Sequence, residues 1–449
     1  MRQFVLTRRD ATAKLEEQPV VESAATTVFD NVRVLDSRTG TVGPSSRVVV
    51  RGNLITSIGA GDDHGAADDL EIAEGARRVD GAGRVIMPGL IDAHWHAAFA
   101  TVPLAVSMRA DPGYIHLLAG RSATDTLLRG FTSVRDAGGP TFGLKQAIDS
   151  GVVPGPRIFP SGAMISQTGG HGDFRSPGDI PRGRLGHHSH TDLLGATAVA
   201  DGVDEVLRAA REQLMLGASQ LKVMAGGGVA SFYDPLDVTQ YTEAELHAAV
   251  EAAANWGTYV MVHAYTPQSV QQAIRAGVRS IEHGQLLDEE TVAMIAEHQL
   301  WWSLQPFLDD EDAPVVTGAS RAKLLQMITG TETAYTLARK HGVKLAWGTD
   351  TLFDPALATR QGAQLAKLTR WFSPAEVISM ATAANAELLE LSGPRNPYPA
   401  GKLGVIAEGA YADLILVDGN PLDDISLLAR PERAFPVIMK DGQFAKNLL

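Results

Sequence analysis

The sequence of 449 residues predicts an α/β fold: a TIM (β/α)8 barrel joined to a small composite β-sandwich formed by both chain ends. Three observations predict this fold. Short apolar strands alternate with helical patterns along the middle of the chain, chemically reactive residue types follow several of those strands, and short β-type runs occupy both ends. Because the active sites of such barrels lie at the carboxyl ends of the strands, the reactive residues predict one shared site.

The middle of the chain contains eight candidate strands separated by helical patterns. Residues 242–256, with a run of Glu and Ala, are typical of a helix, and residues 267–276 predict another that ends at Gly277. Strands that alternate with helices in this way form parallel β/α units. The candidate strands are centred near Ile91, Val134, Ile158, Val223, Val262, Ile281, Leu304 and Leu345.

Both chain ends contain short β-type runs separated by Gly and Asn turns. We expect residues 26–85 and 393–449 to pair as one β-sandwich, with the barrel of residues 86–392 inserted between them. Residues 1–25 are expected to be an extension, either a flexible arm or a segment that packs against a neighbouring subunit. The β-type runs cover residues 27–35, 46–51, 54–58, 412–417 and 436–440.

Composition excludes several classes of protein. Hydrophobic residues make up 45% of the chain and charged residues 20%, so a large core can form, and the formal charge of −13 argues against a nucleic-acid partner. No apolar run approaches the roughly 18 residues of a membrane span, and the first residues lack the apolar segment of a signal peptide. We therefore expect a cytoplasmic protein without a membrane partner. Cysteine is absent, so a metal ion would be held by His and carboxylate groups.

The segment from Val85 to His96 is the most informative in the chain, because it delivers two histidines from the end of an apolar strand. Residues i and i+2 of a strand share a face, so His94 and His96 point the same way and can hold a metal ion. Asp92, two residues before His94, points to the same face of the strand.

Later strand ends add further reactive side chains: Lys222, His263, His283 and Asp350. Taken singly, a histidine at a strand end is compatible with a hydrogen-bonded structural role, Lys222 with substrate binding or solvation, and Asp350 with capping of the next helix. Four histidines at successive barrel positions favour a metal site instead. The remaining candidates fall in predicted helices or helix ends and are interpreted as structural: His116, His247, His298 and His341.

These residues, in this order, resemble the metal-dependent amidohydrolase superfamily. The resemblance covers nearly the whole chain after residue 25, from the motif Pro88–His96 to the return segment 401–418. It implies two divalent metal ions, for which Zn²⁺ suits imidazole and carboxylate ligands. His94, His96 and Asp350 would hold the first ion and His263 and His283 the second. Lys222, carboxylated by carbon dioxide, would bridge both.

The same resemblance assigns a chemical role to the site. A divalent metal lowers the pKa of bound water towards ~7 and polarises the scissile carbonyl. Asp350 would take the proton of the attacking water and return it to the leaving amine.

Two Gly-rich loops, residues 161–175 and 225–235, resemble a branch of this superfamily that contains Xaa-Pro and Xaa-Arg/Lys dipeptidases, carboxypeptidases and ochratoxinase-like enzymes. That branch implies that His171 and Tyr233 hydrogen-bond the scissile carbonyl or the free carboxylate of the departing amino acid. Arg175 is a candidate carboxylate partner, because its planar fork matches carboxylate geometry. Alternatively, these loops only close the top of the barrel. Four apolar residues either line the pocket or pack: Met164, Phe174, Phe232 and Trp302.

The sequence therefore predicts a binuclear hydrolase that cleaves an amide bond next to a free carboxylate and releases an amino acid. A dipeptide, an N-acyl amino acid or an ochratoxin A-type amide would be the small-molecule substrate. One alternative is a cyclic-amide or imidazolone hydrolase, although the imidazolone type uses one metal and lacks the lysine that Lys222 would match. Another is a non-catalytic structural homologue, which would have lost the ligands. The resemblance also implies a homo-oligomer, for example an octamer.

Overall fold

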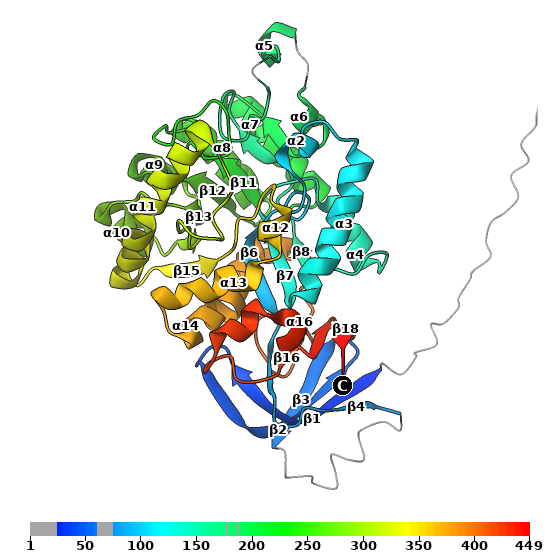
Figure 1. Cartoon of the computed structure of the whole chain (residues 1–449). Coiled ribbons are helices and arrows are strands. Elements are labelled where there is room, and N and C mark those ends of the chain that lie inside the picture. Colours follow the sequence, from blue (N-terminus) through cyan, green and yellow to red (C-terminus); the bar gives the residue numbers. More distant parts are fainter. Residues whose placement is uncertain (1–24, 61–74, 177, 186–187) are drawn as a thin grey trace, which may run out of the picture.

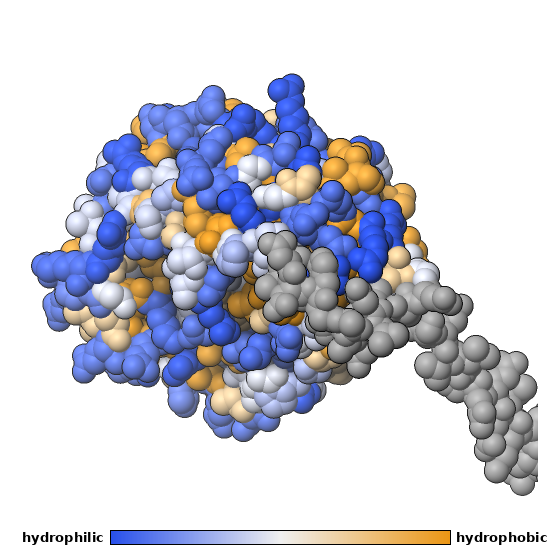
Figure 2. All heavy atoms as spheres, turned by 90° about the horizontal axis from the view of Figure 1, so that it is seen from below, coloured by the Kyte–Doolittle hydropathy of each residue, from blue (hydrophilic) through white to orange (hydrophobic). Residues whose placement is uncertain are grey.

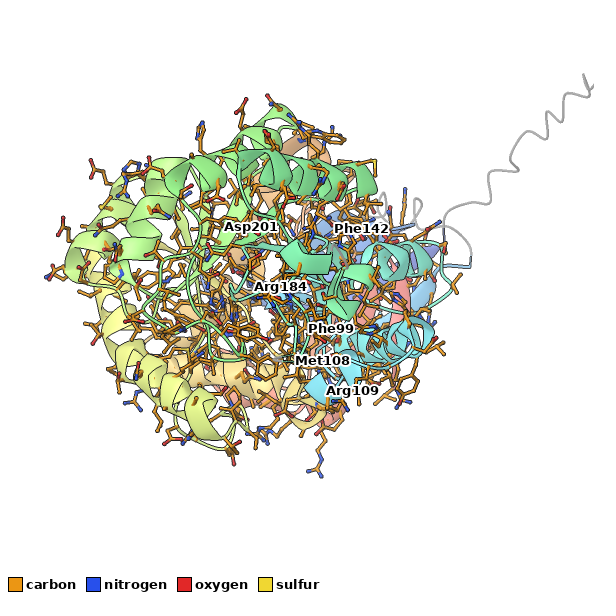
Figure 3. The ribbon with its side chains drawn as sticks, turned by 90° about the horizontal axis from the view of Figure 1, so that it is seen from above. Phe99, Met108, Arg109, Phe142, Arg184 and Asp201 are labelled. Atoms are coloured by element: carbon orange, nitrogen blue, oxygen red, sulfur yellow. The ribbon has the colours of Figure 1, made fainter. Side chains whose placement is uncertain are left out.

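The computed structural model describes residues 25–60, 75–176, 178–185 and 188–449. The expected N-terminal extension lies outside the described residues, except for Ala25. The described chain forms a barrel of parallel strands with a second β-sheet below it (Figure 1). Seen from above, helices form an arc around the barrel (Figure 3). The predicted fold class is confirmed.

All eight predicted barrel strands are present, and the paired barrel strands run parallel. Two short strands share the third position: β8 pairs with β7, and β9, after a break at residues 160–163, pairs with β11. The barrel strands are β6 (Leu90–Trp95), β7 (Phe131–Asp136), β8 (Arg157–Phe159), β9 (Met164–Ser166), β10 (Thr197–Val199), β11 (Leu221–Met224), β12 (Val260–Ala264), β13 (Ser280–His283), β14 (Trp301–Leu304) and β15 (Lys344–Trp347).

The end of β15 approaches the end of β6 and joins the last barrel position to the first. The backbone N–H of Asp350 donates to the carbonyl of His94 at 2.8 Å. Gly348 permits this approach, because a Cβ atom there would lie 2.3 Å from the backbone nitrogen of His94. The residues that follow β15 are thereby fixed beside His94.

Local capping explains where the two predicted helices begin and end. Thr242 caps α8 in a reciprocal capping box with Glu245, and Thr266 caps α9, whose first residue is proline. Gly277, with a φ of 96°, ends α9. The helices around the barrel are α3 (Pro112–Leu128), α4 (Phe142–Asp149), α7 (Val203–Leu216), α8 (Glu243–Asn255), α9 (Pro267–Ala276), α10 (Glu289–Glu297), α11 (Gly318–His341), α13 (Gln361–Ala366) and α14 (Pro374–Ser379).

Shorter helices occupy the loops and the return of the chain to the second sheet. The four histidines interpreted as structural lie in α3, in α8, at the end of α10 and at the end of α11, as expected. The shorter helices are α2 (Leu104–Ser107), α5 (Arg182–Leu185), α6 (His190–Leu193), α12 (Pro355–Ala358), η1 (Lys367–Arg370), η2 (Met380–Ala384), α15 (Asn385–Leu389), η3 (Glu390–Arg395), η4 (Ile425–Ala429) and α16 (Pro431–Ala434).

Both chain ends pair in one eight-stranded sheet, in the order β18-β17-β16-β5-β1-β2-β3 with β4 beside β1. Strand β16 from the C-terminal part runs antiparallel to β5, which immediately precedes the first barrel strand. Apolar side chains from both ends pack in one cluster. The domain boundaries stay a prediction. The strands are β1 (Thr26–Asp36), β2 (Thr41–Arg51), β3 (Leu54–Ala60), β4 (Arg77–Asp80), β5 (Val85–Pro88), β16 (Leu414–Val417), β17 (Val437–Lys440) and β18 (Gln443–Asn447).

The face seen from below is mostly hydrophilic, with apolar residues in separate small patches (Figure 2). Within the described part of the chain, no helix combines the length and the apolar character needed to cross a membrane.

A buried arginine joins the barrel to the second sheet. The guanidinium of Arg157, on β8, donates to Asp413 at 2.8 Å and to Asp441 at 2.5 Å, next to β16 and β17. Its charged group also lies 3.8 Å from the ring centre of Tyr411. The side chains of Arg157 and Asp413 are each only 4% exposed, so each charge depends on the other for compensation.

We predict that Arg157→Leu lowers the free energy of unfolding by about 3–5 kcal/mol, because it leaves the Asp413 carboxylate buried without its partner. Thermal or denaturant unfolding measures this change. Arg370→Leu is the matched control, since Arg370 pairs with Glu332 on the surface and both side chains are more than half exposed. Equal shifts of the two variants would contradict the prediction.

Candidate active site

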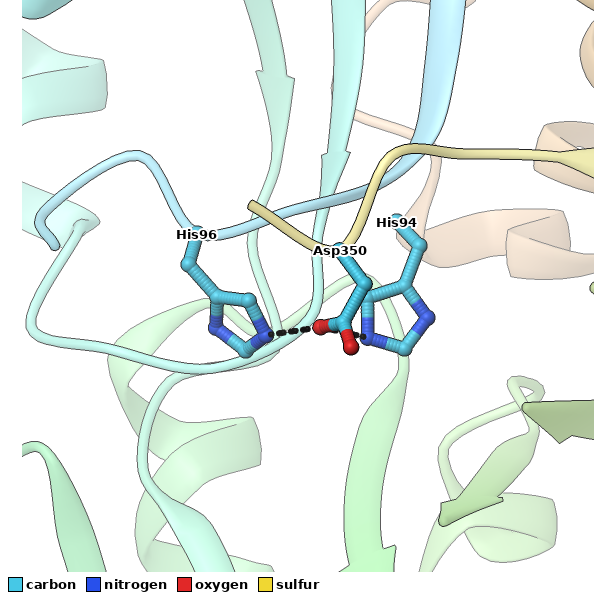
Figure 4. Close-up of side chains that lie close together, drawn as sticks. All are labelled: His94, His96 and Asp350. Carbon is cyan, nitrogen blue, oxygen red and sulfur yellow. Dashed lines mark ion pairs between the residues drawn. The ribbon is translucent and has the colours of Figure 1, made fainter. Parts of the chain in front are cut away.

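The ends of β6 and β15 bring His94, His96 and Asp350 together (Figure 4). Nε2 of His94 lies 3.2 Å, and Nε2 of His96 3.3 Å, from Oδ1 of Asp350. In a tetrahedral zinc site with bonds of about 2.0–2.1 Å, neighbouring ligand atoms lie about 3.3–3.4 Å apart. The spacing of these three side chains therefore fits a shared divalent ion.

Lys222, His263 and His283 lie next to this group. Nζ of Lys222 is 3.4 Å from Nε2 of His94, and Nδ1 of His283 is 3.9 Å from Oδ2 of Asp350. The ring centres of His263 and His283 are 4.5 Å apart. The structure therefore brings all six predicted ligand residues to one cavity. Their function as ligands stays a prediction.

Backbone geometry at the strand ends explains this convergence. Met224 pairs with His263, and His263 pairs with Glu282, so these residues share one phase inside the barrel. Alternation alone would point the next residue, His283, outward. However, His283 has a φ of 76° and Asp350 a φ of 53°, a left-handed conformation that non-glycine residues rarely adopt. The chain thus turns at both positions and directs their side chains into the site.

The second ring nitrogen of each of the four histidines lies against an acceptor oxygen. Such an acceptor needs an N–H at that position, which leaves the other nitrogen of a neutral imidazole with a free lone pair for a metal ion. The donor set therefore fits divalent metal binding. The contacts are His94 Nδ1 to Glu282 Oε2 at 2.7 Å, His96 Nδ1 to the Gly138 carbonyl at 2.9 Å, His283 Nδ1 to Gln305 Oε1 at 2.8 Å, and His263 Nε2 to the Gly227 carbonyl at 3.0 Å.

The Glu282 carboxylate, which contacts His94, is completely buried and accepts several hydrogen bonds. Nη2 of Arg135 donates to both of its oxygens at 2.7 Å, and the Ser280 hydroxyl donates at 2.6 Å. Burial by itself raises the pKa of Glu282, but Arg135 and His94 hold that pKa far below its usual value. The ionised carboxylate keeps the proton of His94 on Nδ1 and leaves Nε2 facing Asp350.

Sequence reasoning missed Glu282, Arg135 and Gln305. Glu282 lies directly before His283 on β13, and Arg135 lies within the second barrel strand. A charged residue inside a short apolar strand is expensive to bury without a partner. The charges of Glu282 and Arg135 inside apolar strands were therefore a signal in the sequence that both need buried partners. The sequence could not show that they are partners of each other.

Burial sets the protonation states of the site. It lowers the pKa of His283 to about 3, and it lowers the pKa values of His96 and His263 below the ordinary value. The pKa of Lys222 falls to about 8 because of burial, against the opposing effect of nearby carboxylates. Burial raises the pKa of Asp350, but the facing histidines outweigh it and hold that pKa well below 3.8. Burial thus favours neutral imidazoles at His96, His263 and His283 beside an ionised carboxylate, and these are protonation states that metal binding requires.

His171 lies over this group, in the loop after β9. Its ring stacks on that of His263 with 4.0 Å between ring centres. Nδ1 of His171 lies 2.8 Å from the Ser231 hydroxyl and 3.6 Å from Oδ2 of Asp234, which leaves Nε2 for a ligand. Gly228 provides the space, because a Cβ atom there would lie 2.0 Å from the His171 ring.

The other two predicted substrate residues do not line the main cavity. Arg175 donates to Asp173, from Nε at 2.7 Å and also from Nη2, and it borders a separate hollow together with Arg109. Tyr233 lies in the loop after β11 and is 44% exposed. The structure therefore brings His171, but not Arg175 or Tyr233, to the candidate metal ligands. A role of these residues in substrate binding stays a prediction.

The cavity has a volume of about 500 Å³ and combines the six ligand-type residues with many apolar side chains. Of the apolar residues considered from the sequence, Met164, Phe174 and Phe232 line it. Trp302 is instead completely buried in the core, where its indole N–H donates to the carbonyl of His283 at 2.6 Å.

A TIM barrel with histidines, a lysine and an aspartate at its strand ends defines a metal-dependent hydrolase. The comparisons agree: the model of the amidohydrolase family matches residues 85–443, and the chain belongs to this family. It is a metal-dependent amidohydrolase that acts on amide bonds.

Similar proteins confirm the branch that the loops indicated. Ochratoxinase from Aspergillus niger is 34% identical over 387 residues, which cover 81% of this chain and 76% of that protein. The structure of a prolidase complexed with N-methylphosphonate-L-proline has a TM-score of 0.85 and 34% identity, covering 94% of this chain and 100% of that chain. The structure of a Xaa-Pro dipeptidase with bound methionine has a TM-score of 0.78 and 29% identity, covering 94% of this chain and 99% of that chain.

We predict that Glu282→Gln weakens metal binding about 10- to 100-fold, because the neutral amide no longer fixes the proton of His94 on Nδ1. Competition with a chelator measures the affinity without an activity assay. Ser280→Ala is the control, since it removes one donor to Glu282 and keeps the carboxylate. Unchanged affinity in Glu282→Gln would show that the carboxylate does not position His94.

Proposed function

We propose that this protein is a binuclear hydrolase that cleaves an amide bond next to a free carboxylate and releases an amino acid. His94, His96 and Asp350 would hold one ion, His263 and His283 would hold the other, and a carboxylated Lys222 would be their shared ligand. Zn²⁺ is the proposed metal, since imidazole nitrogen and carboxylate oxygen suit it.

The observation that carries this proposal is the convergence of six ligand-type side chains, with four imidazoles whose second nitrogens already face acceptors. A single histidine can be structural, but four arranged in this way match the metal-binding tautomers. The similarity to an ochratoxinase, a prolidase and a Xaa-Pro dipeptidase supports substrates in which an amino acid is the leaving group.

Carboxylation of Lys222 is supported by its surroundings. Lys222 is 1% exposed, and the pKa of about 8 of its amine leaves a useful neutral fraction near neutral pH. The neutral amine forms an N–C bond with carbon dioxide and loses one proton, which yields a carbamate. This anion replaces an ammonium that would otherwise repel metal ions at this position.

When bound, the metal ions would acidify a water molecule and polarise the scissile carbonyl. Asp350 accepts the proton of the attacking water and passes it to the departing amine. We assign the proton of His171 to Nε2, with Nδ1 accepting from the Ser231 hydroxyl at 2.8 Å, so that Nε2 donates to the scissile carbonyl or to the free carboxylate of the substrate. Tyr233 and Arg175, which do not line the cavity in this structure, keep the assignment to the free carboxylate that the resemblance implied.

Two alternatives are disfavoured by particular residues. An imidazolone hydrolase lacks a lysine at the position of Lys222, which is buried here at 3.4 Å from His94. A non-catalytic homologue would have lost its ligands, whereas all six residue types are present. Hydrolysis of another cyclic amide remains a competing substrate class. Cytoplasmic location and assembly into a homo-oligomer, for example an octamer, stay predictions.

Metal analysis combined with a substrate screen tests the proposal. We expect close to two zinc ions per chain and release of a free amino acid from dipeptides, N-acyl amino acids or ochratoxin A. Two metal ions without amino-acid release, but with turnover of cyclic amides, would overturn the substrate class. Absence of metal from gently purified protein would overturn the metal site.

Asp350→Asn should lower turnover by at least ~10²-fold, in the range expected for loss of a general base, because the amide cannot accept the proton. The variant should remain folded and keep much of its metal, which circular dichroism and metal analysis check. Near-normal kcat would rule out the proton-transfer role of Asp350.

Lys222→Ala should lose bridged metal and activity, because the substitution removes the group that would carry the bridging anion. Short-chain carboxylic acids added to this variant should restore part of both if a carbamate is the missing group. Lys340→Ala serves as the control lysine, since its ammonium pairs with Glu289 on the surface and both side chains are more than half exposed. A full metal complement in Lys222→Ala would contradict the bridge.

A further inference from the structure

We infer that the outer part of the cavity is a subsite for an uncharged, bulky and apolar acyl group, with Phe232 and Val315 as specificity-determining residues at its mouth. The substrates would then be N-acyl amino acids with a hydrophobic acyl group, in preference to dipeptides with a free ammonium group. This inference rests on the proposed function and narrows its substrate class.

The walls of the cavity are apolar on several sides. Side chains from the loops after β11, β14 and β15, from the segment after β9 and from α11 line it. Burial of an apolar group against such a wall is favourable by about 25 cal/mol per Å². The volume of about 500 Å³ suits a ligand larger than a short aliphatic dipeptide. The principal wall residues are Phe174, Phe307, Leu324, Met327, Leu352 and Phe353.

Two apolar side chains stand exposed where the cavity opens. Phe232, in the loop after β11, is 51% exposed, and Val315, in the loop after β14, is 88% exposed. Both also line the cavity, so a ligand that fills it would cover them. An exposed apolar rim that continues an apolar cavity marks a surface for a hydrophobic ligand.

Polar contacts hold both rim loops. Lys323, on α11, donates to the carbonyls of Gly228 at 3.0 Å and Asp234 at 2.6 Å, on either side of Phe232. In the loop that carries Val315, Asp310 and Asp312 pair with Lys367 at 2.7 and 2.8 Å. The two loops that carry Phe232 and Val315 are therefore held in place by these contacts.

The carboxylates that line the cavity already accept hydrogen bonds or face other polar groups of the protein. Among the described residues that line it, the carboxylates belong to Asp350 and Asp354. Asp350 faces His94 and His96, and Asp354 caps α12 by accepting from two backbone N–H groups at 3.0 Å. A dipeptide would have to desolvate its charged amino group against a mostly apolar wall, where its only carboxylate neighbours among the described lining residues already interact with other groups, and this desolvation is costly.

Three substrates with the same leaving amino acid test the inference on the metal-loaded protein. They are 3-phenylpropanoyl-L-proline, L-phenylalanyl-L-proline and acetyl-L-proline, each repeated with L-phenylalanine as the leaving group. The first two differ only by an ammonium group, and the first and third differ in the apolar part of the acyl group. We expect kcat/KM for the 3-phenylpropanoyl substrate to exceed the other two by at least ~10-fold.

Rim variants test the two named residues. Phe232→Ser and Val315→Ser should each reduce the preference for 3-phenylpropanoyl over acetyl by about 5-fold, as expected for loss of partly buried apolar area. Val152→Ser is the matched control, because Val152 is 75% exposed and does not line the cavity. An unchanged preference in both rim variants would overturn their role.

The outcomes separate the two proposals. Equal rates for the first two substrates, or faster cleavage of the dipeptide, would overturn the inferred acyl subsite and leave the proposed function standing. Cleavage of none of the substrates, with either leaving amino acid, would overturn the proposed function and the inference with it.

Discussion

The buried ion pair of Arg135 and Glu282 fixes the position of His94, and His94 is the residue around which the candidate site is arranged. Its imidazole contacts Glu282 on one side and faces Asp350 and Lys222 on the other. Burying two charges is costly, and the cost is offset only when their hydrogen bonds are satisfied. Here Ser280, Tyr259 and the carbonyl of Ala93 complete them. Three strands of the barrel are thereby linked beneath the site.

The positions of the other site residues depend on how the strands end. Parallel register brings Lys222 and His263 to the inside of the barrel, whereas His283 and Asp350 reach it through left-handed backbone conformations. Such conformations cost of order 1–3 kcal/mol each and persist where surrounding structure enforces them. At Asp350, the hydrogen bond to the carbonyl of His94, with Gly348 allowing close approach, provides that enforcement, and at His283 the indole N–H of Trp302 donates to the carbonyl. Rigid strand ends therefore carry the candidate ligands.

Loops provide the rest of the cavity. His171 reaches the site through contacts with Ser231 and Asp234, two residues of a different loop, so its position depends on the pairing of two segments distant in sequence. The same loops contribute apolar walls. A polar group of ligand-type residues and an apolar enclosure thus arise from separate parts of one barrel end, which is how a common fold can serve different substrates.

Much of the fold could be predicted from the sequence, because the patterns involved are local. The eight strands, the helices that begin at Glu243 and Pro267, and the pairing of the two chain ends follow from hydrophobic periodicity and capping. The six candidate ligand residues followed from a known order of residue types at strand ends. The split of the third strand into β8 and β9 did not, since no periodic signal marks a break of four residues.

The sequence by itself determined which residue types stand at the strand ends, and hence the class of chemistry. Only the tertiary structure decided which ring nitrogen each histidine presents, that Glu282 and Arg135 support His94, and that Arg175 pairs with Asp173 outside the main cavity. The physical reason is the range of the interactions. Periodicity and capping act within a few residues, whereas hydrogen bonds such as that between His94 and Glu282 join positions 188 residues apart and form only when the barrel closes.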